Sequence, residues 1–81
     1  MHKVEQLEDD VRAIVGEILE VDPAHIDGEA KLVQELGMDS MMALEIIASL
    51  EKKYRIKLPE QELQNVTSLN RVIELTRHYV S

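Results

Sequence analysis

Apolar side chains recur at intervals of three and four residues in three separate stretches of this 81-residue chain. This spacing places them along one face of an α-helix, and such a face has to be buried against another element. The repeating residues of the first stretch are Val4, Leu7, Val11, Ile14, Val15 and Ile18. Those of the second are Leu44, Ile47, Leu50 and Tyr54, widened by Ala43, Ile46 and Ala48. Those of the third are Leu69, Val72, Ile73, Thr76 and Val80. The pattern therefore predicts three substantial helices, over residues 3–20, over residues 40–55 and in the last part of the chain.

Between the first two predicted helices, residues 22–39 keep no helical period for long. Asp22-Pro23 should end the first helix, because the residue before a proline disfavours helical backbone. A loop of this length in so small a domain needs anchors or a function. We expect a turn of helix over residues 31–36 and a set of apolar anchors, namely Ile26, Leu32, Val33 and Leu36.

A short fourth helix should begin near Leu58-Pro59, because proline suits the first turn of a helix and Glu60 suits its positive end. Thr67 or Ser68 then caps the last helix. Hydrophobic residues make up 44% of the chain, but it has two aromatic residues and no cysteine, so aliphatic helix packing alone must stabilise it. We predict an all-α fold, a small four-helix bundle with three longer helices, one short helix and a long first loop, in a single domain over residues 1–81.

The net charge of −7 narrows the possible partners. Residues 1–40 hold eleven acidic and three basic residues, whereas residues 41–81 hold five and six. An acidic surface repels nucleic acid and anionic lipid headgroups, so we expect neither as a partner. No apolar run approaches the roughly 20 residues of a membrane span, and the first ten residues lack the apolar stretch of a secretory signal. We expect a cytoplasmic protein that does not insert into membranes.

Several kinds of catalytic and metal site are excluded by the sequence. It has no Gly-x-Ser-x-Gly motif, no glycine-rich phosphate loop with lysine, and no His-Glu-x-x-His pair. Setting Gly28 at the sixth position of a calcium loop would put Pro23 first and Gln34 last, where Asp and Glu are required. We therefore expect no catalytic residue and no metal ligand.

One segment, residues 36–41, stands between the long loop and the start of the second predicted helix. It contains Asp39 and Ser40, two residue types preferred at a helix N-cap. Taken alone, the segment has a simple explanation, which is that both side chains cap the helix. A wider pattern along the chain favours a second interpretation.

Over essentially its full length the chain resembles the acyl carrier protein family. The matching residues are Leu36-Gly37-Met38-Asp39-Ser40-Met41, then Glu45 and Leu50-Glu51, then Ile56-Lys57-Leu58-Pro59. The resemblance implies that a phosphopantetheinyl transferase attaches 4'-phosphopantetheine covalently to Ser40. The protein would then be a monomeric carrier and not an enzyme, since the thiol of the arm holds acyl groups as thioesters.

The resemblance also implies roles for the neighbours of the serine. Asp39, Met41 and Glu45 would help the transferase and the acyl-transferring and acyl-modifying synthase enzymes to recognise the carrier. The apolar faces of the second and last helices, with Leu32 and Ile56 nearby, would part to admit an acyl chain. The same apolar residues are needed simply to fold the bundle.

The chain departs from the family pattern in the charge of the second helix. Many carriers of fatty acid biosynthesis have an acidic residue two positions after the serine, where this chain has Met42, and Lys52-Lys53 balance Glu45 and Glu51. Because rim charges steer encounters and exclude wrong partners, the change indicates a different partner set. We expect a specialised carrier of polyketide, lipid or peptide assembly rather than the housekeeping fatty acid carrier. An aminoacyl or peptidyl carrier and an unmodified helical adaptor remain as alternatives.

Overall fold

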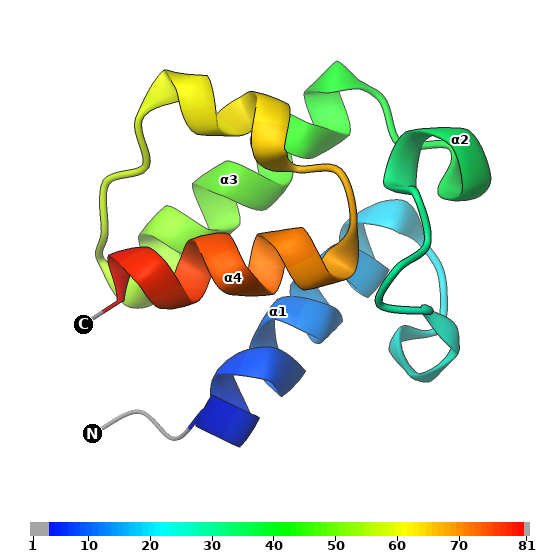
Figure 1. The fold of residues 1–81 in the computed structure, drawn as a ribbon, viewed down its shortest axis with the longest axis horizontal. Helices are drawn as coiled ribbons and strands as arrows, with labels where there is room; N and C mark the ends of the chain where they lie inside the picture. The colour runs from blue at the N-terminus through cyan, green and yellow to red at the C-terminus, as the bar shows by residue number, and fades with distance from the viewer. Residues whose placement is uncertain (1–3, 81) are drawn as a thin grey trace.

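The structure is a computed structural model that describes residues 4–80, with side-chain burial from Gln6 onward. Three longer helices, α1 (Val4–Leu19), α3 (Ser40–Tyr54) and α4 (Leu69–Tyr79), pack together, as Figure 1 shows. Between them lie the short helix α2 (Leu32–Leu36) and two 3-10 helices, η1 (Pro23–His25) and η2 (Glu60–Asn65). Residues 4–80 contain no strand, only an isolated bridge between Lys31 and Ser68. The predicted all-α class and the order of long and short helices are confirmed.

Helix α1 packs against both α3 and α4. Its predicted apolar face is buried at Leu7, Val11 and Val15, and Leu19 extends it by one turn. The predicted start at residue 3 and the side chain of Val4 lie outside the described residues. Glu20 ends the helix with a left-handed backbone, φ 59°.

The long loop after α1 is fixed to the bundle by both side-chain and backbone contacts. Ile26 and Leu32 are buried, as predicted. The Arg12 guanidinium donates to the carbonyl oxygens of Pro23 and Ile26 at 3.0 and 2.7 Å. The prediction was wrong for Val33, which is 53% exposed. Because Leu32 occupies the inward position of the single turn of α2, the adjacent side chain points outward.

Helix α3 buries three residues of its predicted apolar face, but the buried face is narrower than predicted because Leu44 and Ala48 are exposed. Its buried side chains are Ala43, Ile46 and Leu50, spaced three, four and seven residues apart as one helix face requires. Ile47 and Tyr54 pack partly against this core. Leu44, predicted to lie inward, is 53% exposed, because it follows Ala43 by about 100° around the helix.

The chain returns to the bundle through η2 and α4. Element η2 is a 3-10 helix with no buried residue, and it lies between the buried Leu58 and Val66. Helix α4 is capped by Ser68, whose Oγ accepts from the Arg71 amide at 3.2 Å. Its buried residues are Leu69, Val72, Ile73, Leu75 and Thr76. Within the described part of the chain, no helix has the length and apolar character needed to cross a membrane.

Candidate functional site

Ser40 is the first residue of α3, and its side chain is exposed. The cap of this helix is Asp39, whose Oδ1 accepts from the Met42 amide at 2.9 Å. The expectation that both side chains cap the helix is therefore correct for Asp39 and wrong for Ser40. Among the hydrogen bonds of the described residues, none uses the Ser40 hydroxyl, which leaves its oxygen available for chemistry.

The loop before Ser40 is anchored to the core by the buried side chain of Met38. Gly37 ends α2 with a left-handed backbone, φ 72°, which suits glycine, and its amide donates to the carbonyl oxygens of Leu32 and Val33. The Met38 side chain is only 5% exposed, and its amide donates to the Leu32 oxygen at 2.9 Å. Met38 therefore serves the core, and by fixing the loop it presents the next two residues to solvent.

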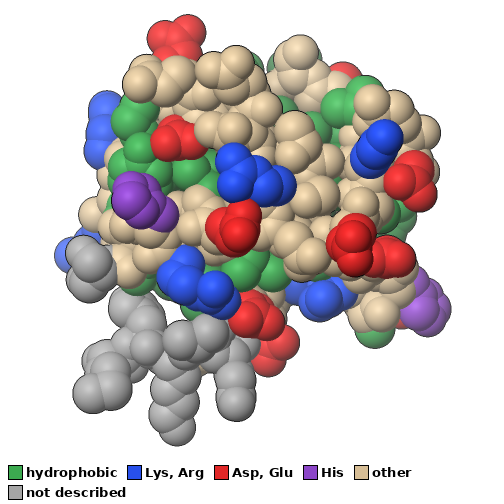
Figure 2. Space-filling model, viewed as in Figure 1, with side chains coloured by type: hydrophobic (Ala, Val, Ile, Leu, Met, Phe, Trp, Pro, Cys, Tyr) green, Lys and Arg blue, Asp and Glu red, His purple; other side chains and the backbone are tan. Residues whose placement is uncertain are grey.

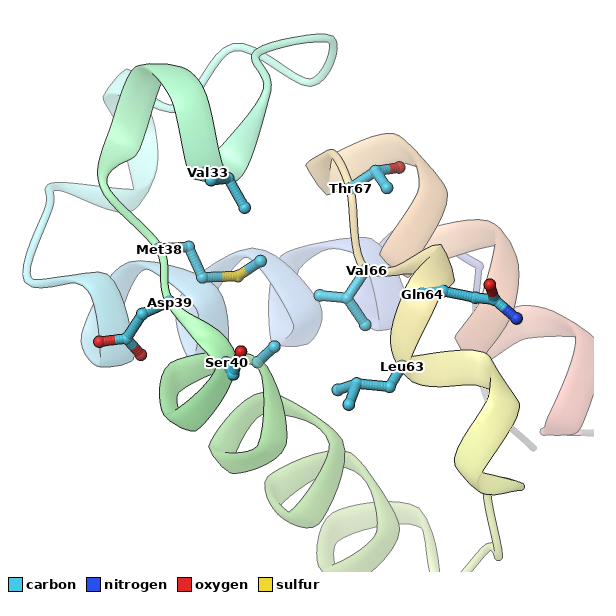
Figure 3. A pocket seen from close by; sticks show the side chains of 9 residues that line it. Val33, Met38, Asp39, Ser40, Leu63, Gln64, Val66 and Thr67 are labelled. Carbon is cyan, nitrogen blue, oxygen red and sulfur yellow. The ribbon is translucent and has the colours of Figure 1, made fainter.

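An open groove with a volume of about 510 Å³ lies beside the serine. Its walls come from α2, the start of α3, η2 and the segment before α4. Figure 3 shows these walls around the N-terminus of α3. The lining residues are Val33, Met38, Asp39, Ser40, Ala43, Leu63, Gln64, Val66 and Thr67. In Figure 3 the Asp39 carboxylate points away from Leu63 and Val66, so the wall nearest the serine is mostly apolar.

The groove is distinct from the opening between the second and last long helices that the family resemblance implies, and that opening stays a prediction. Neither Leu32 nor Ile56 lines the groove. Leu63 and Val66 do, although sequence reasoning gave them no role. They stand three residues apart near a short helix, a spacing that in a 3-10 helix of three residues per turn places side chains on one face. This spacing could have placed Leu63 and Val66 on one face, but only if the segment had been known to form a 3-10 helix.

The predicted recognition residues lie on the solvent side of the same helix start. Met41 is 73% exposed, and Glu45 is exposed one turn further along. Leu44, which is 53% exposed, joins them, so the start of α3 exposes an apolar pair together with the acidic residues Asp39 and Glu45. Met42 is half-buried. Large apolar side chains gathered on an exposed surface are typical of a protein contact.

The rest of the surface carries charges of both signs. Figure 2 shows acidic and basic side chains interspersed on the face formed by α4. Two ion pairs on this face, Arg71 with Glu74 and Arg77 with Glu8, have N–O distances of 2.9 Å.

Far from the serine, burial and the hydrogen bond to Asp10 raise the pKa of Tyr54 to about 12. No group of three or more His, Asp or Glu side chains among the described residues is placed to hold a metal ion.

Comparison with known proteins identifies the family. Residues 9–76 match the family described as "Phosphopantetheine attachment site". A polyketide-8 synthase acyl carrier protein from Streptomyces avermitilis is 42% identical over 65 residues, which is 80% of this chain and 75% of that protein. An acyl carrier protein from Campylobacter curvus is 37% identical over 65 residues, 80% of this chain and 84% of that protein.

A solved structure shares the fold. It is a free-standing peptidyl carrier protein from Acinetobacter baumannii, with a TM-score of 0.78 at 24% identity, covering 94% of each chain. At that identity the likeness shows the fold alone. The family match and the relatives together show that this chain belongs to the acyl carrier protein family, whose members are carriers of acyl or peptidyl groups rather than enzymes and bear a covalent 4'-phosphopantetheine group.

Proposed function

We propose that Ser40 is the attachment point of the phosphopantetheine arm. The observation that carries this proposal is an exposed serine with an uncommitted hydroxyl at the first position of a 15-residue helix, beside an open groove. A transferase would join the arm of coenzyme A to the Ser40 oxygen, which loses its proton as the adenosine bisphosphate part leaves. Once attached, the arm supplies the thiol that holds the cargo as a thioester.

The residues around Ser40 fit a phosphodiester. The first amides of a helix have no partner within the helix, and the helix dipole is positive at this end. The Asp39 side chain and carbonyl already satisfy the amides of Met42 and Ala43. The amides of Ser40 and Met41 have no acceptor among the described hydrogen bonds, so they can face the new negative charge. The negative charge of Asp39 opposes this effect, but its carboxylate points away from the groove (Figure 3).

We propose that partner enzymes recognise the helix start through Asp39, Met41 and Glu45, with Leu44 as a fourth contact. The partners would be a phosphopantetheinyl transferase and the acyl-transferring and acyl-modifying enzymes of a synthase. The exposed Met41 and Leu44 offer apolar area that a partner can bury. The acidic residues Asp39 and Glu45 then orient the encounter more than they strengthen it.

We also propose a dedicated biosynthetic pathway, with polyketide assembly first. Helix α3 ends with Lys52 and Lys53 in its last turn, and its first turn has no acidic residue. This near-neutral charge pattern differs from the strongly acidic second helix of many fatty acid carriers. The 42% identity to a polyketide synthase carrier points the same way. Loading and elongation assays with fatty acid synthase enzymes test this assignment, and full activity with all of them would remove its basis.

Two alternatives lead to different experiments. A carrier of aminoacyl or peptidyl groups uses the same arm on the same fold, so only the identity of the cargo separates it from an acyl carrier. An unmodified adaptor would bind a protein through Met41 and Leu44 and would need no arm.

The extent of the carrier domain is a further proposal. Since α1 packs on both α3 and α4, we propose that residues 1–81 form one domain.

Intact-mass measurement tests the attachment. The apo protein is incubated with coenzyme A and a permissive transferase. We expect a mass gain equal to one arm in the wild type and none in Ser40→Ala. The matched control is Ser49→Ala, which removes another hydroxyl from α3 and should still gain the arm. No gain in the wild type would favour the adaptor, and a gain retained by Ser40→Ala would place the arm elsewhere.

A further inference from the structure

Element η2 is attached to the bundle differently from the three longer helices. None of its residues is buried, and its apolar residue Leu63 is half-buried. On its other side, polar groups reach α4. The Tyr79 hydroxyl donates to Glu62 Oε2 at 2.6 Å, and Arg71 donates to Asn65 Oδ1 at 3.1 Å. Side-chain hydrogen bonds to α4 therefore act together with the packing of Leu63 against the core to fix η2.

The geometry of a 3-10 helix connects these hydrogen bonds to the groove. With three residues per turn, Glu62 and Asn65 lie above one another on one face, while Leu63 lies on the next face. The first face meets α4, and Asn65 also donates to Glu62 Oε1 at 2.8 Å. Leu63 lines the groove beside Ser40, and Figure 3 shows it pointing toward α3. A shift of η2 away from α4 would therefore move the groove wall.

The bond between Tyr79 and Glu62 is well suited to hold this position. Both oxygens of the Glu62 carboxylate are used, one by Tyr79 and one by Asn65. The hydrogen bond from Tyr79 is the largest cause that lowers the pKa of Glu62, and the same bond raises the pKa of Tyr79. The pair thus favours a neutral phenol that donates to an ionised carboxylate, which is a charge-assisted hydrogen bond.

We propose that Tyr79 and Glu62 form a latch that sets the position of η2 and thereby how closely the groove holds an acyl chain carried from Ser40. They are positioning residues, because they act through Leu63 and do not line the groove themselves. The part of the inference that concerns cargo rests on the proposed attachment at Ser40. The part that concerns η2 does not.

Hydrogen exchange of the unmodified protein tests the position of η2. Tyr79→Phe removes only the hydroxyl, and we expect the Glu62 and Val66 amides, which bond to Pro59 and Leu63, to exchange about 3- to 10-fold faster. The matched control is Tyr54→Phe. Tyr54 also ends its helix and donates to a carboxylate, Asp10 at 3.1 Å, but this bond joins α3 to α1. Exchange in η2 should stay at the wild-type rate in the control, and the central amides of α1 report any global loss of stability in either variant.

Thioester protection tests the consequence for cargo. The arm-bearing protein is loaded with an octanoyl or an acetyl group, and cleavage by hydroxylamine is followed by mass. We expect Tyr79→Phe to speed cleavage of the octanoyl thioester several-fold and to leave the acetyl thioester unchanged, since an acetyl group is too short to enter the groove.

The outcomes separate this inference from the proposed function. Wild-type exchange of η2 in Tyr79→Phe would overturn the latch, whereas equal effects on both thioesters would overturn its effect on the cargo. If Ser40 accepts no arm, the attachment fails while the exchange result still decides whether Tyr79 positions η2.

Discussion

Helices α3 and α4 begin and end with similar side-chain contacts, but they differ in how many of their residues are buried. Each begins with a capping side chain, Asp39 or Ser68, and each ends with a tyrosine that donates to a carboxylate on another element. Yet the 15 residues of α3 include three buried ones, while the 11 residues of α4 include five. Most apolar residues of α4 are buried in the core, whereas α3 exposes two large apolar side chains, Met41 and Leu44, to solvent near Ser40. The difference indicates that α4 stabilises the bundle and that α3 also serves contacts with other proteins.

The largest expected effect is on the stability contributed by α4. Leu69 is fully buried, so Leu69→Ala should lower the free energy of unfolding by about 2 to 5 kcal/mol through lost burial and the cavity left behind. Leu44→Ala removes the same atoms from an exposed site on α3 and should change stability by less than about 0.5 kcal/mol. Urea unfolding of both variants measures the contrast. Equal losses would contradict the division of roles between the two helices.

A smaller effect distinguishes the two residues at the start of α3. Asp39→Ala removes the cap and should cost about 1 kcal/mol, while Ser40→Ala should cost less than about 0.5 kcal/mol because the serine does not cap. The two variants are compared by thermal or urea unfolding of the apo protein. A larger loss in Ser40→Ala would show that the serine has a structural role, which would weaken the argument that it is kept for attachment.

A change in unfolding free energy of similar or smaller size is expected at the buried threonine of α4. The Thr76 hydroxyl donates to the Val72 oxygen at 2.7 Å in a fully buried position. Thr76→Val keeps the shape and removes this bond, so we expect a loss of about 0.5 to 1.5 kcal/mol. On α3, Ala48→Ser adds a hydroxyl at an exposed position and should have almost no effect. Unfolding in urea measures both, and a Thr76→Val variant more stable than the wild type would contradict the assigned role of the bond.

The smallest effect concerns the end of α3, and it depends on pH. The pKa of Tyr54 is raised from 10.0 to about 12, first by burial and then by Asp10. The neutral phenol is favoured in the folded state, so its contribution is complete below about pH 10 and is lost as the pH rises toward 12. The difference in stability between wild type and Tyr54→Phe should therefore shrink over this window. A difference that stays constant from pH 8 to 12 would contradict the raised pKa of Tyr54 in the folded protein.

Much of the fold could be predicted from the sequence because helix faces follow a fixed period. The spacing of apolar residues located all three longer helices, and the family resemblance singled out Ser40. The inward face of α3 was harder to predict, because Ala43, Leu44, Ile46 and Ile47 together span an arc of about 160° around the helix. The elements that pack against α3, chiefly α1 and η2, decide that Ile46 is buried and Leu44 is exposed.

The groove and the cap could not be deduced in the same way. Asp39 and Ser40 are both good capping residues, and a shift of one position in the helix start decides between them. The groove depends on how η2 lies against α3 and α4, which is set by hydrogen bonds between residues far apart in the chain, such as Glu62 and Tyr79. Period and propensity carry no information on such contacts.

The most direct test of the account is the chemical state of the protein taken from its own cells. Peptide mass spectrometry of the purified protein locates any arm and weighs its cargo. The account predicts phosphopantetheine on the peptide that contains Ser40, with an acyl group bound as a thioester to part of the material. An unmodified Ser40 peptide throughout, or an arm on another residue, would contradict it.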